Sequence, residues 1–547
     1  MIGRPGDAKE KPLRSYSSYV GGEDVPGSEW VYCLRASALL ADVLPGLALK
    51  RDLEKGRRHD GDSHEIVEAR CAIADDEVSQ RALEAARAAA PVWGATPLDV
   101  RFRVIERFHE ELWRRREEFV SVIVAEGHPR TLAEWEVASL LRCSDGPTTA
   151  WCRQQMGWDF VEGDRQLRLV RKPDGVVVLS PPLNAAAISS LSGVAVLAAG
   201  NALVVKAPRS SPYGVMWALR ELLVPVLDEV GAPPGVLNVL CGHPTQMIDQ
   251  WMESPLVDDI MFFGSSEVGI PLGVEAVRRG KKPILELAGN DGCVVWRDAD
   301  IDSAAEALTE CFFGSGQICM VPNYVVAHPA IADALIDRLV SLAGKVRPGY
   351  PEDPEVLLSP VYKTEKYFAY LSEAMEMGAE LLTGGRRLEV DGEPSETGIF
   401  IEPTVLRVNG LARAREMSAV AKETFFPLLP VVVAEDVPDD QLLGDVIGFV
   451  NANPYGLRNS LWAQSPDVIE QFVTRVTNGG ILKVNDSHVA LPPYLAPNGG
   501  GGLTGGPFGE LNYPMLRTSH LQGISIGTGI QPRRAVVEAY AAREATR

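Results

Sequence analysis

The chain has 547 residues, of which 46% are hydrophobic and 23% charged, and its formal net charge is −20. That length exceeds what one hydrophobic core supports, so two or three domains are expected. The acidic charge argues against nucleic acid or an anionic membrane as the main partner, although a phosphate-bearing cofactor needs only local donors. Eight cysteines and eight histidines are scattered without paired or metal-ligand spacing. This indicates reduced thiols in a cytoplasmic protein and predicts no metal site.

The first 70 residues are predicted to form an N-terminal arm and an irregular insertion, with one apolar run over 36–49 and a charged patch after it. From Asp76 the apolar residues recur at helical spacing, which predicts three packing helices before residue 142. Residues 158–172 alternate around a Gly-centred turn and predict a β-hairpin. The apolar stretch 185–205 is diluted by serine and glycine, so we expect a buried helix and strand rather than a membrane span.

After residue 172 the pattern alternates between strands and helices. Strands are predicted at 175–179, 202–206, 236–240, 259–263 and 283–287. Such alternation is typical of a parallel, doubly wound sheet with helices on both faces. Sheets of this kind bind ligands at the carboxyl ends of their strands.

Polar and small residues collect at those predicted strand ends. Asn184 follows the first strand, Lys206 ends the second, and the fourth leads into Gly264, Ser265 and, one helical turn on, Gly269. The Gly-Ser turn opens a helix, where backbone N–H groups and the helix dipole favour a phosphate group. Each signal alone is weak, because Gly-Ser turns and solvated lysines are common.

The stretch 285–319 carries one carboxylate, Glu286, and one thiol, Cys319, each set among small residues. A thiolate can add to a carbonyl carbon, and a nearby carboxylate can activate water that releases the product. A buried cysteine and a strand-end glutamate are the plainer interpretation of either residue alone.

In order along the chain, these motifs resemble those of the aldehyde dehydrogenase superfamily over about residues 75 to 525. The matching segments are Pro182-Leu183-Asn184, Lys206-Ala207-Pro208, Phe262-Phe263-Gly264-Ser265 with Gly269, Glu286-Leu287-Ala288-Gly289, Gly316-Gln317-Ile318-Cys319, Glu423-Thr424-Phe425-Phe426-Pro427, Asn453-Pro454-Tyr455-Gly456-Leu457, and Gly479-Gly480 before Val484-Asn485. Each motif is moderately specific, and the ordered series is very specific.

The resemblance implies a reaction and assigns catalytic roles. An aldehyde would be oxidised to a carboxylic acid with NAD(P)⁺ through a covalent thiohemiacetal and thioester on Cys319. Asn184 and the Cys319 backbone N–H would form the oxyanion hole, and Glu286 would activate the hydrolytic water. The cofactor-binding residues implied in this way are Lys206, Arg209, Gly264, Ser265, Gly269, Leu287, Glu423 and Phe425.

The resemblance also implies a fold with three parts. A doubly wound cofactor domain would span 71–157 and 173–287, and a second α/β catalytic domain 288–497. Small β-hairpin oligomerisation elements would comprise 158–172 and 498–530, followed by a C-terminal tail at 531–547. A homodimer or homotetramer acting on a small-molecule aldehyde is expected.

Several residues depart from the family pattern. Leu183 stands where tryptophan is usual, Ala288 replaces a glycine, Phe426 replaces another glycine, and Asn323 replaces an arginine. These changes leave two alternatives open. One is a relative that passes the acyl group to coenzyme A or a carrier thiol, which the presence of Glu286 disfavours. The other is a cofactor-binding protein with little turnover.

Cofactor and substrate preferences are also suggested. NAD⁺-preferring relatives often carry a glutamate three residues after the strand-end lysine, where this chain has Arg209. A guanidinium can bond a 2′-phosphate, so NADP⁺ is expected to be accepted at least as well as NAD⁺. The small residues at 185–187, where relatives often place aromatic side chains, favour a bulky or polar aldehyde.

Overall fold

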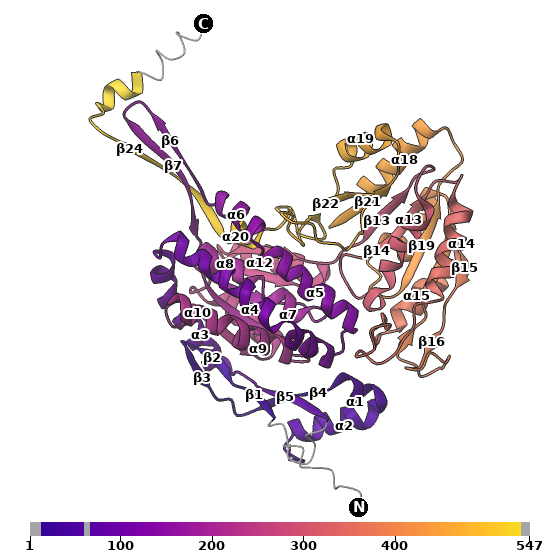
Figure 1. The fold of residues 1–547 in the computed structure, drawn as a ribbon, viewed down its shortest axis with the longest axis horizontal. Helices are drawn as coiled ribbons and strands as arrows, with labels where there is room; N and C mark the ends of the chain where they lie inside the picture. The colour runs from indigo at the N-terminus through magenta and orange to yellow at the C-terminus, as the bar shows by residue number, and fades with distance from the viewer. Residues whose placement is uncertain (1–12, 60–65, 538–547) are drawn as a thin grey trace, which may run out of the picture.

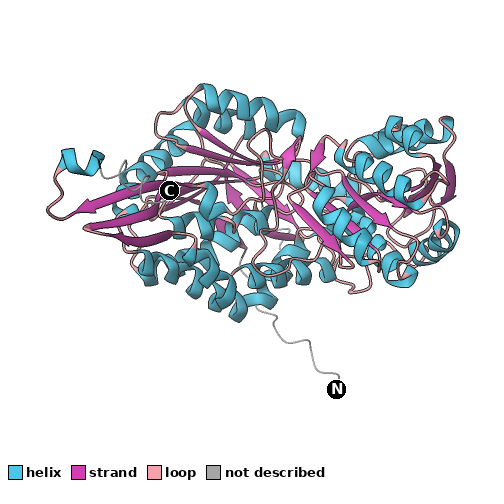
Figure 2. Ribbon diagram, turned by 90° about the horizontal axis from the view of Figure 1, so that it is seen from above, coloured by secondary structure: helices cyan, strands magenta, loops and turns pink. Residues whose placement is uncertain are grey.

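The computed structural model describes residues 13–59 and 66–537. Two seven-stranded sheets form two α/β domains, and a three-stranded arm projects from the first domain (Figure 1). Helices cover both faces of the sheets (Figure 2). This confirms the predicted fold class.

The sheet of the first domain, the cofactor domain, has the strand order β12-β11-β8-β9-β10-β2-β3. Its parallel strands are almost wholly buried and rich in Val, Leu and Ile, as expected for strands covered on both faces. They are β8 (Val176–Ser180), β9 (Ala202–Ala207), β10 (Leu237–Cys241), β11 (Asp259–Phe263) and β12 (Lys282–Glu286). The chain winds outward from β8 in both directions, so the ligand-binding crevice is expected beside β8.

Helices pack on both faces of this sheet. The first face-covering helices are α3 (Asp76–Gly94), α4 (Leu98–Ala125), α5 (Arg130–Cys143) and α6 (Gly146–Gln154). The crossover segments are α7 (Ala186–Ser190), α8 (Gly193–Ala199), α9 (Tyr213–Trp217), a π-helical turn (Ala218–Leu223), α10 (Val224–Val230), α11 (Pro244–Glu253) and α12 (Ser266–Arg278). The apolar stretch 185–205 therefore forms two short helices and a buried strand.

The catalytic domain has the strand order β15-β18-β19-β14-β13-β21-β22. Its strands are β13 (Asp291–Val295), β14 (Pro322–Ala327), β15 (Glu380–Thr383), β18 (Thr404–Asn409), β19 (Leu428–Val433), β21 (Arg458–Trp462) and β22 (Ile481–Val484). Its helical elements are α13 (Ile301–Leu308), the 3₁₀ segment η3 (Thr309–Gly316), α14 (Ala332–Ala343), α15 (Glu365–Glu376), α16 (Leu411–Glu416), α17 (Ser418–Ala421), α18 (Asp439–Asn451) and α19 (Pro466–Arg475). Short strand pairs β16 (Arg387–Leu388) with β17 (Phe400–Ile401), and β20 (Tyr455–Gly456) with β23 (Gly501–Gly502), complete the loops.

The projecting arm joins distant parts of the chain. The predicted hairpin is present as β6 (Gly157–Glu162) and β7 (Arg165–Pro173), and β24 (Ser519–Gly527) pairs antiparallel with β7 along its whole length. The helix α20 (Pro514–Arg517) precedes β24. Residues 498–513, expected to belong to this arm, instead cross back over the domain interface, where β23 pairs with β20.

For residues 13–59 and 66–70 the prediction of an irregular N-terminal region is wrong; the rest of that region lies outside the described residues. Residues 14–72 form β1 (Arg14–Tyr16), β2 (Ser18–Val20), β3 (Glu23–Val25), β4 (Trp30–Leu34), α1 (Ala36–Ala41), α2 (Val43–Glu54) and β5 (Val67–Ala72). The first strands are three residues long, too short to show a periodic pattern. They are stabilised by remote partners, because β2 pairs with β10 and β1 with β5.

Candidate functional site

A cavity of about 2140 Å³ lies between the strand ends of the cofactor domain and the loops of the catalytic domain. Ten of the eleven predicted site residues line it. They are Asn184, Lys206, Arg209, Gly264, Ser265, Glu286, Leu287, Cys319, Glu423 and Phe425. Gly269, the eleventh, lies one helical turn inside α12. A Cβ there would come within 2.1 Å of Leu287 Cδ2, so this glycine lets α12 pack against the end of β12.

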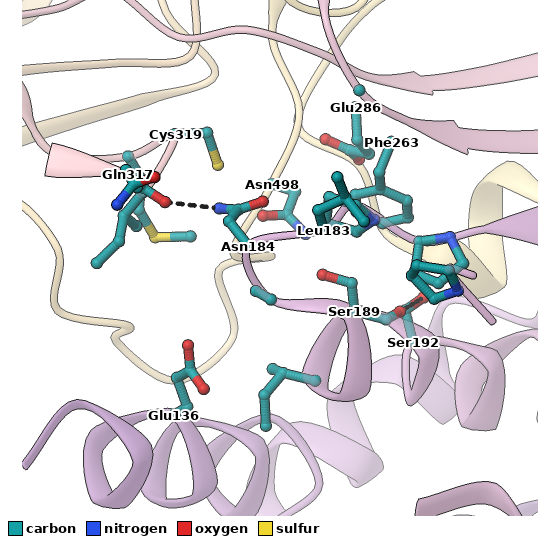
Figure 3. Close-up of a pocket in the computed structure, with 18 of the residues that line it drawn as sticks. Glu136, Leu183, Asn184, Ser189, Ser192, Phe263, Glu286, Gln317, Cys319 and Asn498 are labelled. Atoms are coloured by element: carbon teal, nitrogen blue, oxygen red, sulfur yellow. Dashed lines mark hydrogen bonds between the residues drawn. The ribbon is translucent and has the colours of Figure 1, made fainter. Parts of the chain in front are cut away.

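Cys319 lies on a tight loop that follows η3. The backbone of Gly314, Ser315 and Gly316 is left-handed, with φ of 59°, 58° and 69°. At Gly316 any Cβ would approach the Phe426 carbonyl oxygen to 2.5 Å, so a larger residue would displace the loop. These turns place the half-buried Cys319 side chain at the cavity wall rather than in the core (Figure 3).

Asn184 contacts this loop directly. Its Nδ2 atom donates a hydrogen bond of 2.9 Å to the carbonyl oxygen of Gln317. Figure 3 shows the Asn184 side chain beside the Cys319 loop, with this bond dashed. One of the two Nδ2 hydrogens is therefore used to hold the amide in place, and the second is available to another acceptor.

Glu286 ends β12, and its side chain is almost fully buried. Asn512 Nδ2 donates to Glu286 Oε1 at 2.6 Å, and the backbone N–H of Gly499 also donates to the carboxylate. Burial raises the pKa of Glu286 to about 8, although both hydrogen bonds and the Arg517 charge oppose the shift. A carboxyl group with such a pKa exchanges protons readily near neutral pH.

The Cys319 thiol is held in its neutral form by its surroundings. Burial, and then the nearby carboxyl groups of Glu423 and Asp291, raise the pKa of Cys319 to about 12. The buried Arg458 guanidinium acts in the opposite direction. Formation of the thiolate therefore needs a base or an added positive charge in the cavity.

The end of β9 presents two cations to the cavity. Lys206 is 3% exposed, and burial lowers its pKa. Arg209 Nε is buried without a hydrogen-bond partner. Within residues 13–59 and 66–537, neither side chain forms an ion pair with a carboxylate. A buried lysine beside a half-buried arginine, neither paired with a carboxylate in the described ranges, fits an anionic ligand.

The opposite wall carries Glu423 and Phe425. The Gly289 N–H donates to Glu423 Oε1 at 2.9 Å, and burial raises the pKa of Glu423 to about 7. Phe425 has a φ of 56°, which is unusual for an aromatic residue. This turn sends the Phe426 ring into the core of the catalytic domain, where it packs edge-on against Tyr367 at 5.4 Å between ring centroids.

Two of the substituted positions are also accommodated by the structure. The Ala288 carbonyl accepts from Thr504 Oγ1 at 2.8 Å, so this backbone is held in place. Asn323 is buried, accepts from the Asp291 N–H and donates to Thr424 Oγ1, which makes it part of the domain core. Leu183, by contrast, is 66% exposed on the cavity rim.

Three residues near the site were not predicted from the sequence. Asn512 lies in a glycine-rich segment that was assigned to the arm. Arg458 directly follows a recognised motif, and its guanidinium donates to the His488 and Pro497 carbonyls at 2.9 and 2.6 Å, which holds the 488–497 wall of the cavity. Lys50 lies on α2, more than 150 residues before Arg209 in the chain.

The described residues include neither a membrane-spanning helix nor a metal-binding cluster. Among residues 13–59 and 66–537, no helix is long and apolar enough to cross a membrane. No cluster of His, Cys, Asp or Glu side chains in the same ranges could hold a metal ion.

The fold and the cavity together define a class of protein: a two-domain α/β enzyme with a dinucleotide-type sheet and a cysteine on a loop facing it. A family model described as the aldehyde dehydrogenase family matches residues 60–513. The chain therefore belongs to the aldehyde dehydrogenase family. The predicted class, an NAD(P)-dependent aldehyde dehydrogenase, is confirmed.

Individual relatives are similar over most of the chain. A glutarate-semialdehyde dehydrogenase from Pseudomonas putida is 28% identical over 436 residues, which cover 77% of this chain and 84% of that protein. A vanillin dehydrogenase from Corynebacterium glutamicum is 30% identical over 426 residues, covering 76% and 82%. The crystal structure of an NAD-dependent aldehyde dehydrogenase from Sinorhizobium meliloti shares the fold, with a TM-score of 0.78, 24% identity and coverage of 97% and 98%.

Proposed function

We propose that the protein oxidises an aldehyde to a carboxylic acid with NAD(P)⁺ through a covalent intermediate on Cys319. The observation that carries this proposal is that one cavity is lined by the Cys319 thiol, the Asn184 amide and the Glu286 carboxyl group. These are a nucleophile, an oxyanion donor and a base. They come from three segments far apart in the sequence (Figure 3).

The cavity has the donors that a dinucleotide needs. Lys206 and Arg209 would hold the adenosine ribose and its substituents. Ser265 and the N-terminus of α12 would hold the pyrophosphate, because the helix dipole and free N–H groups favour anions there. Glu423, beside Phe425, would accept from the hydroxyls of the second ribose. When bound, NAD(P)⁺ supplies a hydride acceptor.

The chain's own residues would perform the other steps. Cys319 Sγ, once deprotonated, forms a bond to the aldehyde carbon, and the carbonyl electron pair moves to the oxygen. The free Nδ2 hydrogen of Asn184 and the Cys319 N–H stabilise that oxyanion. Loss of hydride from the same carbon leaves a thioester. Glu286 then takes a proton from water, the resulting hydroxide attacks the thioester, and the C–S bond breaks to release the carboxylic acid and the Cys319 thiolate.

The neighbourhood of Asn184 favours a bulky or polar aldehyde. Ala185, Ile188, Ser189 and Ser192 line the cavity with small or polar side chains. The Ser189 hydroxyl points into it in Figure 3, whereas the Ser192 hydroxyl donates to the Ser189 carbonyl oxygen at 2.7 Å. Room and hydroxyl groups near the nucleophile suit a substrate larger than acetaldehyde.

We also propose the domain functions and a homo-oligomer. Residues 71–157 and 173–287 would bind the cofactor and residues 288–497 would carry the nucleophile. The arm made of β6, β7 and β24 exposes Trp158, Phe160 and Val161 in an almost fully exposed strand. Such a strand at a sheet edge is suited to pairing with a second copy of the chain.

A single assay tests the proposed reaction. Formation of NAD(P)H would be followed with a panel of aliphatic, aromatic and hydroxylated aldehydes, with and without coenzyme A. Turnover without coenzyme A, with the carboxylic acid as product, supports the proposal. Turnover only with coenzyme A would replace hydrolysis by thiol transfer, and tight cofactor binding without turnover on any aldehyde would mean that the chain is a binding protein.

A further inference from the structure

The helices α1 and α2 form a hairpin that is inserted between β4 and β5, two strands that pair with each other. This hairpin, residues 36–54, lies beside the cavity, and Leu39, Val43 and Leu47 contribute apolar side chains to the wall. Leu40 is buried against core residues of the catalytic domain. One face of the hairpin therefore packs against one end of the cavity, while its turn, with Leu44 80% exposed, faces solvent.

Lys50, on the last turns of α2, connects the hairpin to the end of β9. Its Nζ donates to the carbonyl oxygen of Ser210 at 3.3 Å. Ser210 directly follows Arg209, and Lys50, Arg209 and Lys206 all line the same cavity. The three cations therefore meet where β9 ends.

The electrostatics of a buried neighbour support this convergence. Cys241 ends β10, the strand next to β9, and is fully buried. Burial raises the pKa of this thiol to about 12, and Lys206, Arg209 and Lys50 each act in the opposite direction. The positive charges of all three side chains therefore act on the buried Cys241 thiol.

Few carboxylates neutralise this cluster. Lys50 faces Glu54 at 4.0 Å, at the limit of an ion pair. Glu126 is also nearby, but its Oε1 accepts from Ser211 Oγ at 2.6 Å, and burial raises its pKa. In a chain with a net charge of −20, three cations around one cavity wall are unusual and fit a ligand with a compact double negative charge.

We propose that Lys50 is a specificity-determining residue for the 2′-phosphate of NADP⁺, supplied by the inserted α1–α2 hairpin and acting together with Arg209 and Lys206. The inference rests on the proposed function, because it places the adenosine ribose at the end of β9. An ammonium group on a helix turn can reach a phosphate oxygen while the Arg209 guanidinium bonds a second one. NAD⁺, which has only hydroxyls on that ribose, would gain little from Lys50.

Binding of 2′,5′-ADP and 5′-AMP to the full-length protein, measured by calorimetry, tests the proposal without any aldehyde. Lys50→Met should weaken 2′,5′-ADP binding by about 10-fold, because a charge-assisted hydrogen bond is lost. Its effect on 5′-AMP should be below about 2-fold, because that ligand lacks the second phosphate. Glu54→Gln should strengthen 2′,5′-ADP binding, because Glu54 is the one carboxylate within ion-pair distance of Lys50 in the described part of the chain.

The matched control is Lys55→Met, which removes an exposed lysine at the end of the same helix. The proposal is overturned if Lys50→Met weakens the binding of both ligands equally. It is overturned too if Lys50→Met weakens 2′,5′-ADP binding no more than Lys55→Met does. It is also overturned if Glu54→Gln leaves 2′,5′-ADP binding unaltered. The aldehyde assay separates this failure from failure of the proposed function. If the wild-type protein still oxidises aldehydes, the proposed reaction stands and only the role of Lys50 is rejected.

Discussion

Asn512 donates a 2.6 Å hydrogen bond from Nδ2 to Oε1 of Glu286, across 226 residues of chain. The same Nδ2 atom lies 3.3 Å from the Leu285 carbonyl oxygen, and the Asn512 amide oxygen is buried without a partner. Together with the Gly499 N–H, this bond fixes the orientation of the Glu286 carboxylate. Asn512 therefore acts as a positioning residue for the proposed base.

Replacing Asn512 by alanine should raise the pKa of Glu286 further, because the carboxylate form loses a donor that favours it. Turnover at neutral pH should fall by roughly 10-fold, with less effect at high pH, where Glu286 is ionised in either protein. Asn512→Asp cannot donate from Oδ when ionised, so its turnover at neutral pH should fall by at least as much. A purely structural role predicts equal losses at all pH values, so pH profiles of kcat for the three proteins decide the matter.

The pKa of about 8 for Glu286 makes hydrolysis of the thioester pH-dependent. A general base works only when deprotonated, so kcat should rise as pH increases and level off above about 8. Well below that pKa, each unit of pH should reduce the rate by about 10-fold. The measurement is kcat from pH 6 to 10 with saturating cofactor; a flat profile would argue that hydrolysis does not limit turnover or does not use Glu286.

Glu286→Gln should separate the two halves of the reaction. The amide cannot take a proton from water, whereas hydride loss needs only the oxyanion stabilised by Asn184. Rapid mixing should therefore show a burst of NAD(P)H near one equivalent per site, followed by steady-state turnover slowed by on the order of 10²-fold or more. Loss of the burst together with the steady state would assign Glu286 to thiol activation or to structure instead.

Cys319→Ala should abolish aldehyde oxidation and leave cofactor binding within about 2-fold of wild type, because the side chain is small and the loop is held by Gln317 and the left-handed turn. Cys311→Ala is the matched control. That thiol is fully buried in the same segment, and within the described ranges its one hydrogen bond is to the Leu428 carbonyl. Near wild-type oxidation by Cys319→Ala would falsify the assignment of the nucleophile.

Arg209→Glu should shift the preference from NADP⁺ toward NAD⁺. The guanidinium has no carboxylate partner in the described ranges and lines the cavity beside Lys206. A carboxylate in its place would repel a 2′-phosphate and could accept from ribose hydroxyls. The expected change is roughly 10- to 100-fold in relative kcat/KM, measured with both cofactors at one aldehyde concentration. The prediction is contradicted if the wild-type enzyme strongly prefers NAD⁺ and the substitution leaves that preference unchanged.

The sequence by itself determined the fold class and most of the candidate site. Buried parallel strands need apolar residues on both faces, so β8 to β12 could be predicted as apolar runs separated by helices. The site residues were predicted from the resemblance of the ordered motifs to the aldehyde dehydrogenase family, and some of those motifs carry a residue that close backbone approach requires. Gly269 against Leu287 and Gly316 against the Phe426 carbonyl show this requirement.

Only the tertiary structure decided which distant residues complete the site. Asn512 reaches Glu286, and Lys50 reaches Ser210, through contacts between segments with no periodic pattern of their own. The short strands β1 to β3 and the α1–α2 hairpin depend on remote partners, so local propensity does not reveal them. The direction of the Phe426 ring likewise depends on a left-handed backbone at Phe425, which the surrounding core stabilises against its intrinsic cost.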